Sequence, residues 1–125
     1  MYLTHENDHE YRFGTHGPKY LTTGERVDLG VVVIGPGEEH PCHMHTKQEE
    51  SFLGLEGQCD VYVNGEKVVL DAGTYLICEP GDAHYFHNPY GEPFKAVFVK
   101  APHLPEKDSV YIEWKPGQVF EKPTE

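Results

Sequence analysis

Glycine and proline punctuate this chain at short intervals, and this spacing limits what it can fold into. The sequence contains 13 Gly and 10 Pro among 125 residues, and no window between them carries apolar residues at helical spacing. Several of the intervening segments have strand length, are rich in Val, Ile, Phe and Tyr, and are bounded by turn residues. These expected strands cover residues 27–34, 51–56, 60–63, 67–70, 74–78, 84–87 and 94–100. Many short strands separated by frequent turns favour an all-β barrel or sandwich.

The Asn64-Gly65 pair is the strongest local turn signal. It lies between residues 60–63 and 66–70, two expected strands of similar length. A two-residue hairpin of this kind needs positive φ at both positions, which Asn and Gly tolerate. We therefore expect these two strands to pair as a hairpin.

The length suits a single domain spanning residues 1–125. We expect the barrel core to cover roughly residues 20–102, between an N-terminal and a C-terminal arm. Residues 1–19 are polar and His-rich, with a turn at Gly17-Pro18, and the tail from Ala101 contains one further possible strand, 110–114. The arms are expected to wrap the barrel or a partner subunit, with the first eight and last six residues loose.

Charge and cysteine content narrow the partners and the compartment. Twenty-one acidic residues against ten basic ones give a formal charge of −11, which disfavours a nucleic-acid partner. The longest apolar run, 31–34, is far below a membrane span, and no signal peptide is visible, so we expect a cytoplasmic protein without a membrane partner. Cys42, Cys59 and Cys78 have no regular spacing and are predicted to be free thiols.

A group of histidines and one carboxylate carries the chemistry. His43 and His45 are separated by one residue, so on a strand both imidazoles point to the same face. Glu50 follows at the start of the next strand, and an antiparallel turn would return it alongside the histidines. His84 begins a later strand, after the turn at residues 79–83. Three imidazoles and one carboxylate suit a single divalent transition metal (Fe, Mn, Zn, Ni, Co or Cu), with positions left open for water or substrate.

These residues fall into two motifs that resemble those of the cupin superfamily, in the small single-domain type. The first motif reads Gly37, His43, His45, Glu50 and Gly57. The second reads Gly73, Glu79-Pro80-Gly81, His84 and Asn88. The one departure is Glu79, where the family usually has proline, and Pro80 next to it can stiffen the same turn.

The resemblance implies a jelly-roll β-barrel (double-stranded β-helix) of six or more antiparallel strands, usually dimeric, with the metal inside near one mouth. In the family pattern His43, His45, Glu50 and His84 match the metal ligands. Glu49 would fit the shorter of the two gaps that the family allows after the histidines, but its spacing to Gly57 would then depart from the family pattern. Glu50 is therefore the expected ligand.

The sequence identifies the catalytic acid or base less clearly than it identifies the metal ligands. The candidates that could reach a barrel mouth are Tyr62, Tyr75, Tyr85, Lys100 and Arg12. Strand alternation places His40 on the face opposite His43, and His87 on the face opposite His84, so both are interpreted as surface or supporting histidines. By the same counting Phe52 should line the cavity, while Asn88 is expected to tie a turn.

Three functions remain open. The first is an enzyme that uses the metal to isomerise, epimerise or eliminate from a small oxygenated substrate such as a sugar, sugar acid or keto acid. The second is a metal-dependent dioxygenase using Fe, Ni or Cu. The third is a non-catalytic module that senses or binds a metal or small ligand. A homodimer is expected in each case, since an N-terminal arm from another subunit could cover an exposed barrel edge.

Overall fold

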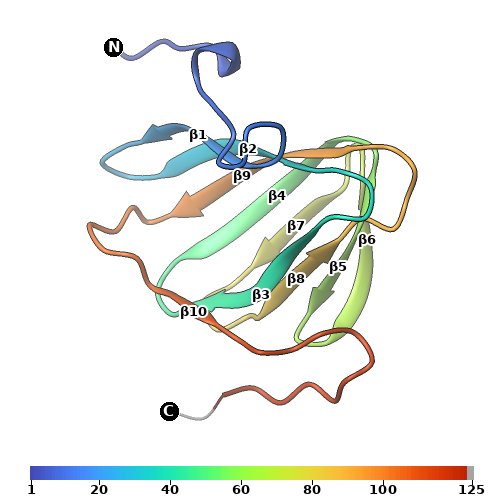
Figure 1. Cartoon of the computed structure of the whole chain (residues 1–125). Coiled ribbons are helices and arrows are strands. Elements are labelled where there is room, and N and C mark those ends of the chain that lie inside the picture. Colours follow the sequence, from blue (N-terminus) through green and yellow to red (C-terminus); the bar gives the residue numbers. More distant parts are fainter. Residues whose placement is uncertain (124–125) are drawn as a thin grey trace.

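The fold consists of two five-stranded antiparallel sheets that face each other (Figure 1). A computed structural model describes residues 1–123. The strand orders are β1-β2-β9-β4-β7 and β10-β3-β8-β5-β6. A short 3₁₀ helix, η1 (Glu6–Asp8), precedes the strands. In chain order these are β1 (Gly17–Thr23), β2 (Asp28–Ile34), β3 (Glu39–His45), β4 (Glu49–Glu56), β5 (Gln58–Val63), β6 (Glu66–Asp71), β7 (Tyr75–Cys78), β8 (His84–His87), β9 (Phe94–Ala101) and β10 (Ser109–Tyr111).

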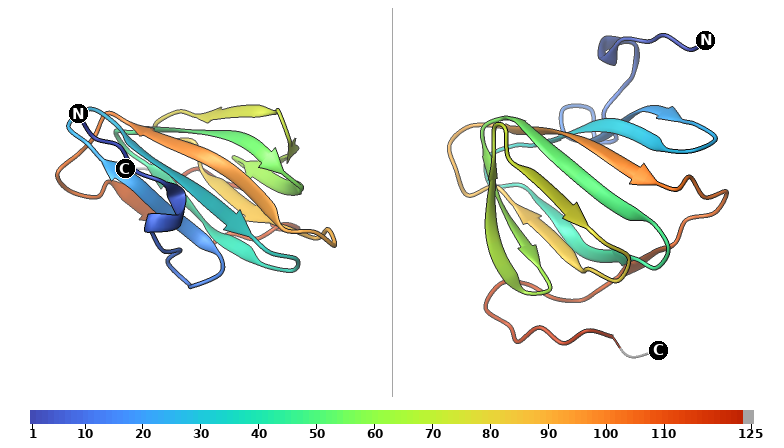
Figure 2. Two further views of the ribbon diagram at one scale, coloured as in Figure 1. Left: turned by 90° about the horizontal axis from the view of Figure 1, so that it is seen from above. Right: turned by 180° about the vertical axis from the view of Figure 1, so that it is seen from behind.

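The main core lies between the two sheets, which form the two layers of the molecule (Figure 2). In β9 the buried residues alternate along the strand, so every second side chain points inward. Phe94, Ala96 and Phe98 of this strand are at most 2% exposed. They pack against side chains from both sheets, including Val32, Phe52, Val61, Leu70 and Phe86. The expected all-β barrel of jelly-roll type is thus confirmed.

The seven predicted strands are all present, with ends within two residues of the expected ones. The hairpin at Asn64-Gly65 is confirmed, with φ of 51° and 82° at the two turn residues. The prediction for residues 110–114 is wrong in extent, because the strand there covers only Ser109–Tyr111. Beyond it the side chains of Ile112 and Trp114 pack outside the barrel against Cys42, Ala83 and Tyr85. Burial, together with one backbone hydrogen bond from the N–H of Ile112 to the carbonyl oxygen of Cys42, holds that segment.

Strand β1 was not predicted, because its sequence is polar and begins with the Gly17-Pro18 pair. It pairs with β2 from Gly17↔Val33 to Thr23↔Asp28 and forms the edge of its sheet. Lys19 is buried there, beside Glu6 of η1. The sheet therefore begins slightly before the expected start of the core, and the N-terminal segment lies against β1 (Figure 1).

All three cysteines are free and buried, as expected from their irregular spacing. Burial raises the pKa of the Cys59 and Cys78 thiols to about 12, so both are held as neutral thiols in the core. Among residues 1–123, none of the helical structure is long and apolar enough to cross a membrane.

Candidate metal centre

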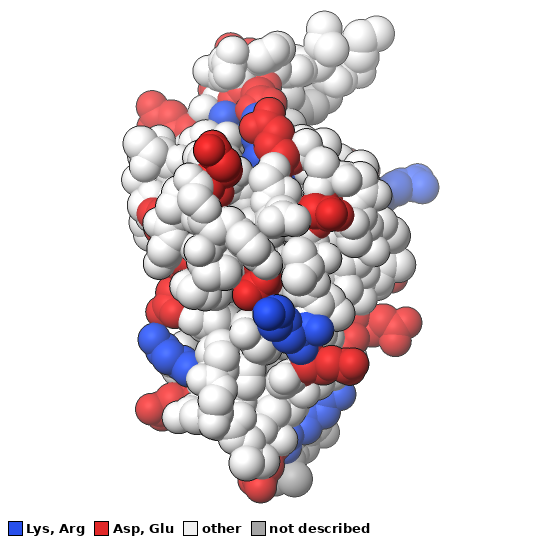
Figure 3. Space-filling model, turned by 90° about the vertical axis from the view of Figure 1, so that its right-hand side faces the viewer, with Lys and Arg blue, Asp and Glu red and all other residues white. Residues whose placement is uncertain are grey.

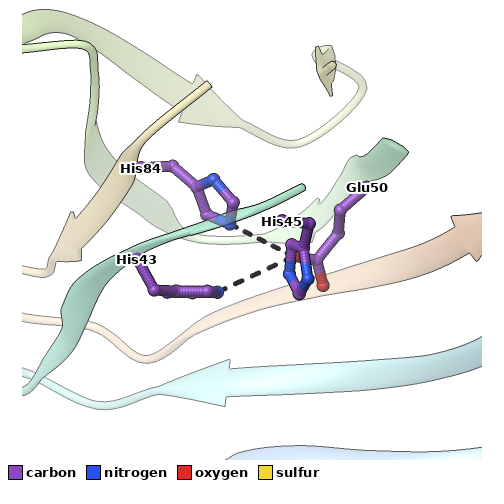
Figure 4. Close-up of side chains that lie close together, drawn as sticks. All are labelled: His43, His45, Glu50 and His84. Carbon is purple, nitrogen blue, oxygen red and sulfur yellow. Dashed lines mark hydrogen bonds and ion pairs between the residues drawn. The ribbon is translucent and has the colours of Figure 1, made fainter. Parts of the chain in front are cut away.

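His43, His45, Glu50 and His84 converge on one point inside the barrel (Figure 4). The two histidines of β3 and His84 of β8 come from one sheet, and Glu50 of β4 comes from the other. Oε1 of Glu50 lies 3.2 Å from Nε2 of both His45 and His84, and 4.0 Å from Nε2 of His43. One donor atom from each residue lies within 4.8 Å of the other three. The four predicted ligands thus form a cluster that could hold one metal ion.

The second ring nitrogen of each histidine is held by an acceptor outside the cluster. Nδ1 of His43 lies 3.0 Å from the carbonyl oxygen of Pro41, and Nδ1 of His84 lies 3.0 Å from that of Asp82. Nδ1 of His45 lies 3.0 Å from Oδ1 of Asp108. In a metal-bound centre, a proton on each Nδ1 would leave all three Nε2 atoms free to bind the ion. The rings are therefore oriented so that their Nε2 atoms could ligate one metal ion.

Burial and mutual contact set the ionisation of the cluster. Burial lowers the pKa of His43 to about 3, which favours the neutral imidazole that a metal requires. Burial alone would raise the pKa of Glu50, but hydrogen bonds from His45 and His84 outweigh it and hold that pKa well below its usual range. Glu50 is therefore ionised. A carboxylate with three neutral imidazoles leaves a bound divalent ion with about one net positive charge.

The cluster opens into a cavity of about 490 Å³. Its walls are largely apolar and come from both sheets, with Val32, Ile34, Phe52, Phe86 and Phe98 as the main apolar residues. The prediction that Phe52 lines the cavity is confirmed. The polar side chains that share the cavity with the cluster are Arg12, Tyr20, Glu39, His40, Gln48, Lys100, Lys107, Asp108, Ser109 and Tyr111.

The placement of His40 on the outer face is wrong. Its ring centroid lies 5.1 Å from that of His43, and both side chains line the cavity. In the pairing of β3 with β8, His40 faces Phe86 and His43 faces His84, so β3 holds one more residue than its partner over this stretch. This β-bulge reverses the alternation. The signal in the sequence was Pro41, since proline inside a strand pattern marks an edge or a bulge.

Among the candidate acids and bases, Lys100 and Arg12 line the cavity and the three tyrosines do not. Tyr75 is 58% exposed on the outside of the barrel. Tyr62 and Tyr85 pack with Trp114 on the outer side of the other sheet, where the Tyr85 hydroxyl donates to Glu39. Alternation along β8 also turns His87 away from His84, and His87 is not part of the cavity wall.

Lys100 lies beside the cluster because of strand register. It is the direct partner of Glu50 in the pairing of β9 with β4, so both side chains leave the sheet on the same face. Its Nζ donates to the Tyr20 hydroxyl at 2.7 Å. Burial alone would lower the pKa of Lys100, but the Glu50 charge and the Tyr20 hydrogen bond raise it above the usual value. Lys100 is therefore an ammonium cation and cannot act as a base in this state.

Tyr20 and Asp108 are site residues that the sequence reasoning missed. Tyr20 belongs to the unpredicted strand β1, and its ring stands edge-on to Phe98 at 5.1 Å. Asp108 lies just before β10 and contacts His45 across 63 positions of sequence. No local pattern identifies either residue, because each reaches the site only through tertiary pairing.

The sequence comparisons agree with this geometry. A family model described as "Cupin domain" matches residues 30–100. The chain is 30% identical over 88 residues to the tetracenomycin polyketide synthase protein TcmJ of Streptomyces glaucescens. The match covers 70% of this chain and 59% of TcmJ, so the chain spans about three-fifths of that relative.

Solved structures show the same fold. A conserved protein from Klebsiella pneumoniae with a double-stranded β-helix domain superimposes with a TM-score of 0.77 at 22% identity, covering 91% of this chain and 99% of that one. The polyketide cyclase RemF of Streptomyces resistomycificus superimposes with a TM-score of 0.73 at 19% identity, covering 93% and 89%. At these identities the similarity establishes the fold and leaves the reaction open.

Proposed function

Because this chain belongs to the cupin domain family, we propose that it is a metal-dependent enzyme that moves a proton on a small oxygenated substrate. The reaction class is isomerisation, epimerisation or elimination next to a carbonyl group. The observation that carries this proposal is the position of the cluster of His43, His45, Glu50 and His84, which opens into a cavity large enough for a small molecule.

A divalent transition metal held by these four side chains would polarise substrate oxygens and stabilise the negative charge that develops when a carbon-bound proton leaves. The protein supplies the remaining requirements. His40 stands next to the cluster without belonging to it, which places an imidazole nitrogen where it can accept a proton from the substrate. Burial lowers the pKa of His40 to about 4, in keeping with a neutral ring.

The apolar walls refine the substrate class. Phe52, Phe86 and Phe98 offer aromatic surfaces and no hydrogen bonds to a row of sugar hydroxyls. They suit a keto acid or a related carbonyl compound with an apolar body better than a bare sugar. The names of two similar proteins, which refer to polyketides, support this choice because polyketides carry repeated carbonyl groups.

A dioxygenase is the second candidate. Three imidazoles and one carboxylate are donors that iron, nickel and copper also accept, and the aromatic walls would fit a flat substrate as well. The two candidates differ in whether oxygen is consumed.

The test is carbon–hydrogen exchange in deuterated water. Protein with its metal content measured is incubated without oxygen with a panel of 2-oxo acids and sugar acids, and NMR follows deuterium incorporation. We expect exchange with at least one compound, little with His84→Ala, and about 100-fold slower exchange with His40→Gln at full metal content. Full occupancy with no exchange across the panel would contradict the proposal, and oxygen uptake in air would favour the dioxygenase.

We also propose that the protein is a homodimer in the cytoplasm. The outer surfaces of β4 and β7 expose a group of apolar side chains, in which Leu53 and Tyr75 are cross-strand partners and Ile77 lies nearby. Apolar groups of this kind often mark subunit contacts. Light scattering that gives the mass of a single chain would contradict the dimer.

A further inference from the structure

We infer that the cavity binds a substrate carrying an acidic group, a carboxylate or a phosphate, which Lys100 and Arg12 hold while the substrate's other end faces the four-residue cluster. This inference rests on the proposed function and adds the charge of the substrate and the residues that recognise it. The geometry points to an anion site in the wall of the same cavity, where Lys100 of β9 and Arg12 of the segment before β1 both line it.

The two cations at this cavity, Arg12 and Lys100, have no carboxylate partner. Within residues 1–123, five of the ten basic residues have an acidic oxygen within 4.0 Å, and neither Arg12 nor Lys100 is among them. Arg12 and Lys100 line the same cavity. The Glu50 charge acts on Lys100, but Glu50 belongs to the metal cluster. Two cations that line one cavity without a carboxylate partner within 4.0 Å favour an anionic ligand there.

The acidic side chains around the cavity already have partners of their own. Glu50 belongs to the metal cluster. Asp108 accepts hydrogen bonds from the backbone of Lys47 and Gln48 and faces His45. Glu39 accepts from Tyr85 and pairs with Lys115. None of these carboxylates is free to neutralise Lys100 or Arg12.

Asp28 of β2 is the register partner of Lys100 of β9, but it is engaged elsewhere. Its Oδ1 lies 2.8 Å from Nδ1 of His103, and its Oδ2 accepts a hydrogen bond from Gln48. Lys100 turns instead to the Tyr20 hydroxyl. The Tyr20 contact fixes the ammonium at the cavity wall and leaves two of its three N–H donors for a ligand.

Basic residues line this cavity although the chain as a whole is acidic. The chain carries a formal charge of −11, and on the face drawn in Figure 3 both acidic and basic side chains are scattered among neutral ones. Three of the ten basic residues nevertheless line this one cavity: Arg12, Lys100 and Lys107. Basic side chains in the wall of a cavity can attract and orient small anions.

The experiment compares three probe acids on manganese-loaded protein by calorimetric titration. Malate, 3-phosphoglycerate and 2-hydroxybutanoate share a 2-hydroxycarboxylate end that can face the cluster, and they differ in carrying a distal carboxylate, a distal phosphate or a methyl group. We expect malate or 3-phosphoglycerate to bind about tenfold or more tightly than 2-hydroxybutanoate. The tighter of the two identifies the acidic group.

Variants assign the preference to the two cations. Arg12→Gln and Lys100→Met should each remove most of the preference for the distal acid, measured as the ratio of its affinity to that of 2-hydroxybutanoate in the same variant. Arg26→Gln and Lys67→Met, which change exposed residues outside the cavity, are the matched controls and should keep it. Arg12 is exposed at the mouth, so Arg12→Gln tests the inference even if Lys100→Met fails to fold.

Two outcomes separate this inference from the proposed function. Equal affinities for the three probes at full manganese occupancy, or a preference that survives both variants, would overturn the anion site alone. Protein that folds but takes up no metal would overturn the proposed function. In that case succinate and inorganic phosphate are titrated instead. If either one binds, and Arg12→Gln weakens the binding, the anion site is still supported. If neither binds, the anion site is overturned as well.

Discussion

Nδ1 of His45 lies 3.0 Å from Oδ1 of Asp108, a residue 63 positions later in the chain. The other carboxylate oxygen, Oδ2, accepts hydrogen bonds from the backbone N–H groups of Lys47 and Gln48, each at 2.8 Å. One carboxylate thus orients the His45 ring and fixes the turn between β3 and β4. Because Glu50 follows that turn, Asp108 helps to set the position of two of the four cluster residues.

We expect Asp108→Asn to weaken metal affinity by about 10- to 100-fold, the range found when a group that orients a ligating histidine is removed. The amide cannot accept from His45 with the strength of a carboxylate, so the ring would lose its fixed orientation. Competition with a chelating dye measures the affinity. Glu106→Gln changes an exposed acid of the same segment and is the control. Equal affinities for Asp108→Asn and the control would show that Asp108 does not position the ligand.

The sequence predicted the four-residue cluster because the motifs place each member on a strand with the right alternation. His43 and His45 share a face by simple counting, and the gap to Gly57 distinguishes Glu50 from Glu49. The expectation that Asn88 ties a turn is also confirmed, since its side chain bonds the backbone at Ile34, Tyr90 and Glu92.

The sequence failed where the backbone departs from regular alternation or where the partner is remote. A single extra residue in β3 turned His40 into the cavity. Tyr20 was not identified because β1 is a polar edge strand. Its pairing with β2 stabilises it, and its own sequence lacks the alternating apolar pattern of a strand. Asp108 contributes through a tertiary contact that leaves no local signal.

Stability of the metal-free protein should fall as the pH drops from 7 to 5. Burial lowers the pKa of His40 to about 4 and that of His43 to about 3, from an unfolded value of 6.5. Between these values the unfolded chain binds protons that the folded chain does not, so acid favours unfolding. Each histidine contributes about 1 to 2 kcal/mol over this interval. The raised pKa of His45 acts in the opposite direction and offsets part of the loss.

Urea unfolding at pH 7 and pH 5 in the presence of a chelator measures this dependence. His40→Gln should reduce the difference in unfolding free energy between the two pH values by about 1 to 2 kcal/mol. His87→Gln, which removes a histidine outside the cavity, is the matched control. An unchanged pH dependence in His40→Gln would mean that the ring takes up its proton as easily in the folded chain as in the unfolded one.

Asn88→Ala should lower the free energy of unfolding by about 2 to 4 kcal/mol. Asn88 is fully buried, and its Nδ2 donates to the carbonyl oxygens of Ile34 and Glu92 while its Oδ1 accepts from the N–H of Tyr90. Alanine would leave these backbone groups without their partners. Denaturant titration compares it with Asn7→Ala, which changes an exposed residue of η1. A loss no larger than that of Asn7→Ala would show that water replaces the Asn88 contacts.

The neighbouring glutamates of β4 offer the sharpest test of the metal centre. Glu50 is 6% exposed and contacts three histidines, whereas Glu49 is an exposed residue on the outer face of the same strand. Glu50→Gln keeps the shape of the side chain but removes the anionic donor, so we expect metal content after purification to fall from about one equivalent to below about a tenth. Glu49→Gln makes the same chemical change one residue away and should keep the full content. Because the two variants also change net charge equally, a difference between them cannot come from overall electrostatics. Equal metal content in both would mean that Glu50 is not a ligand, and that the three histidines alone hold the ion.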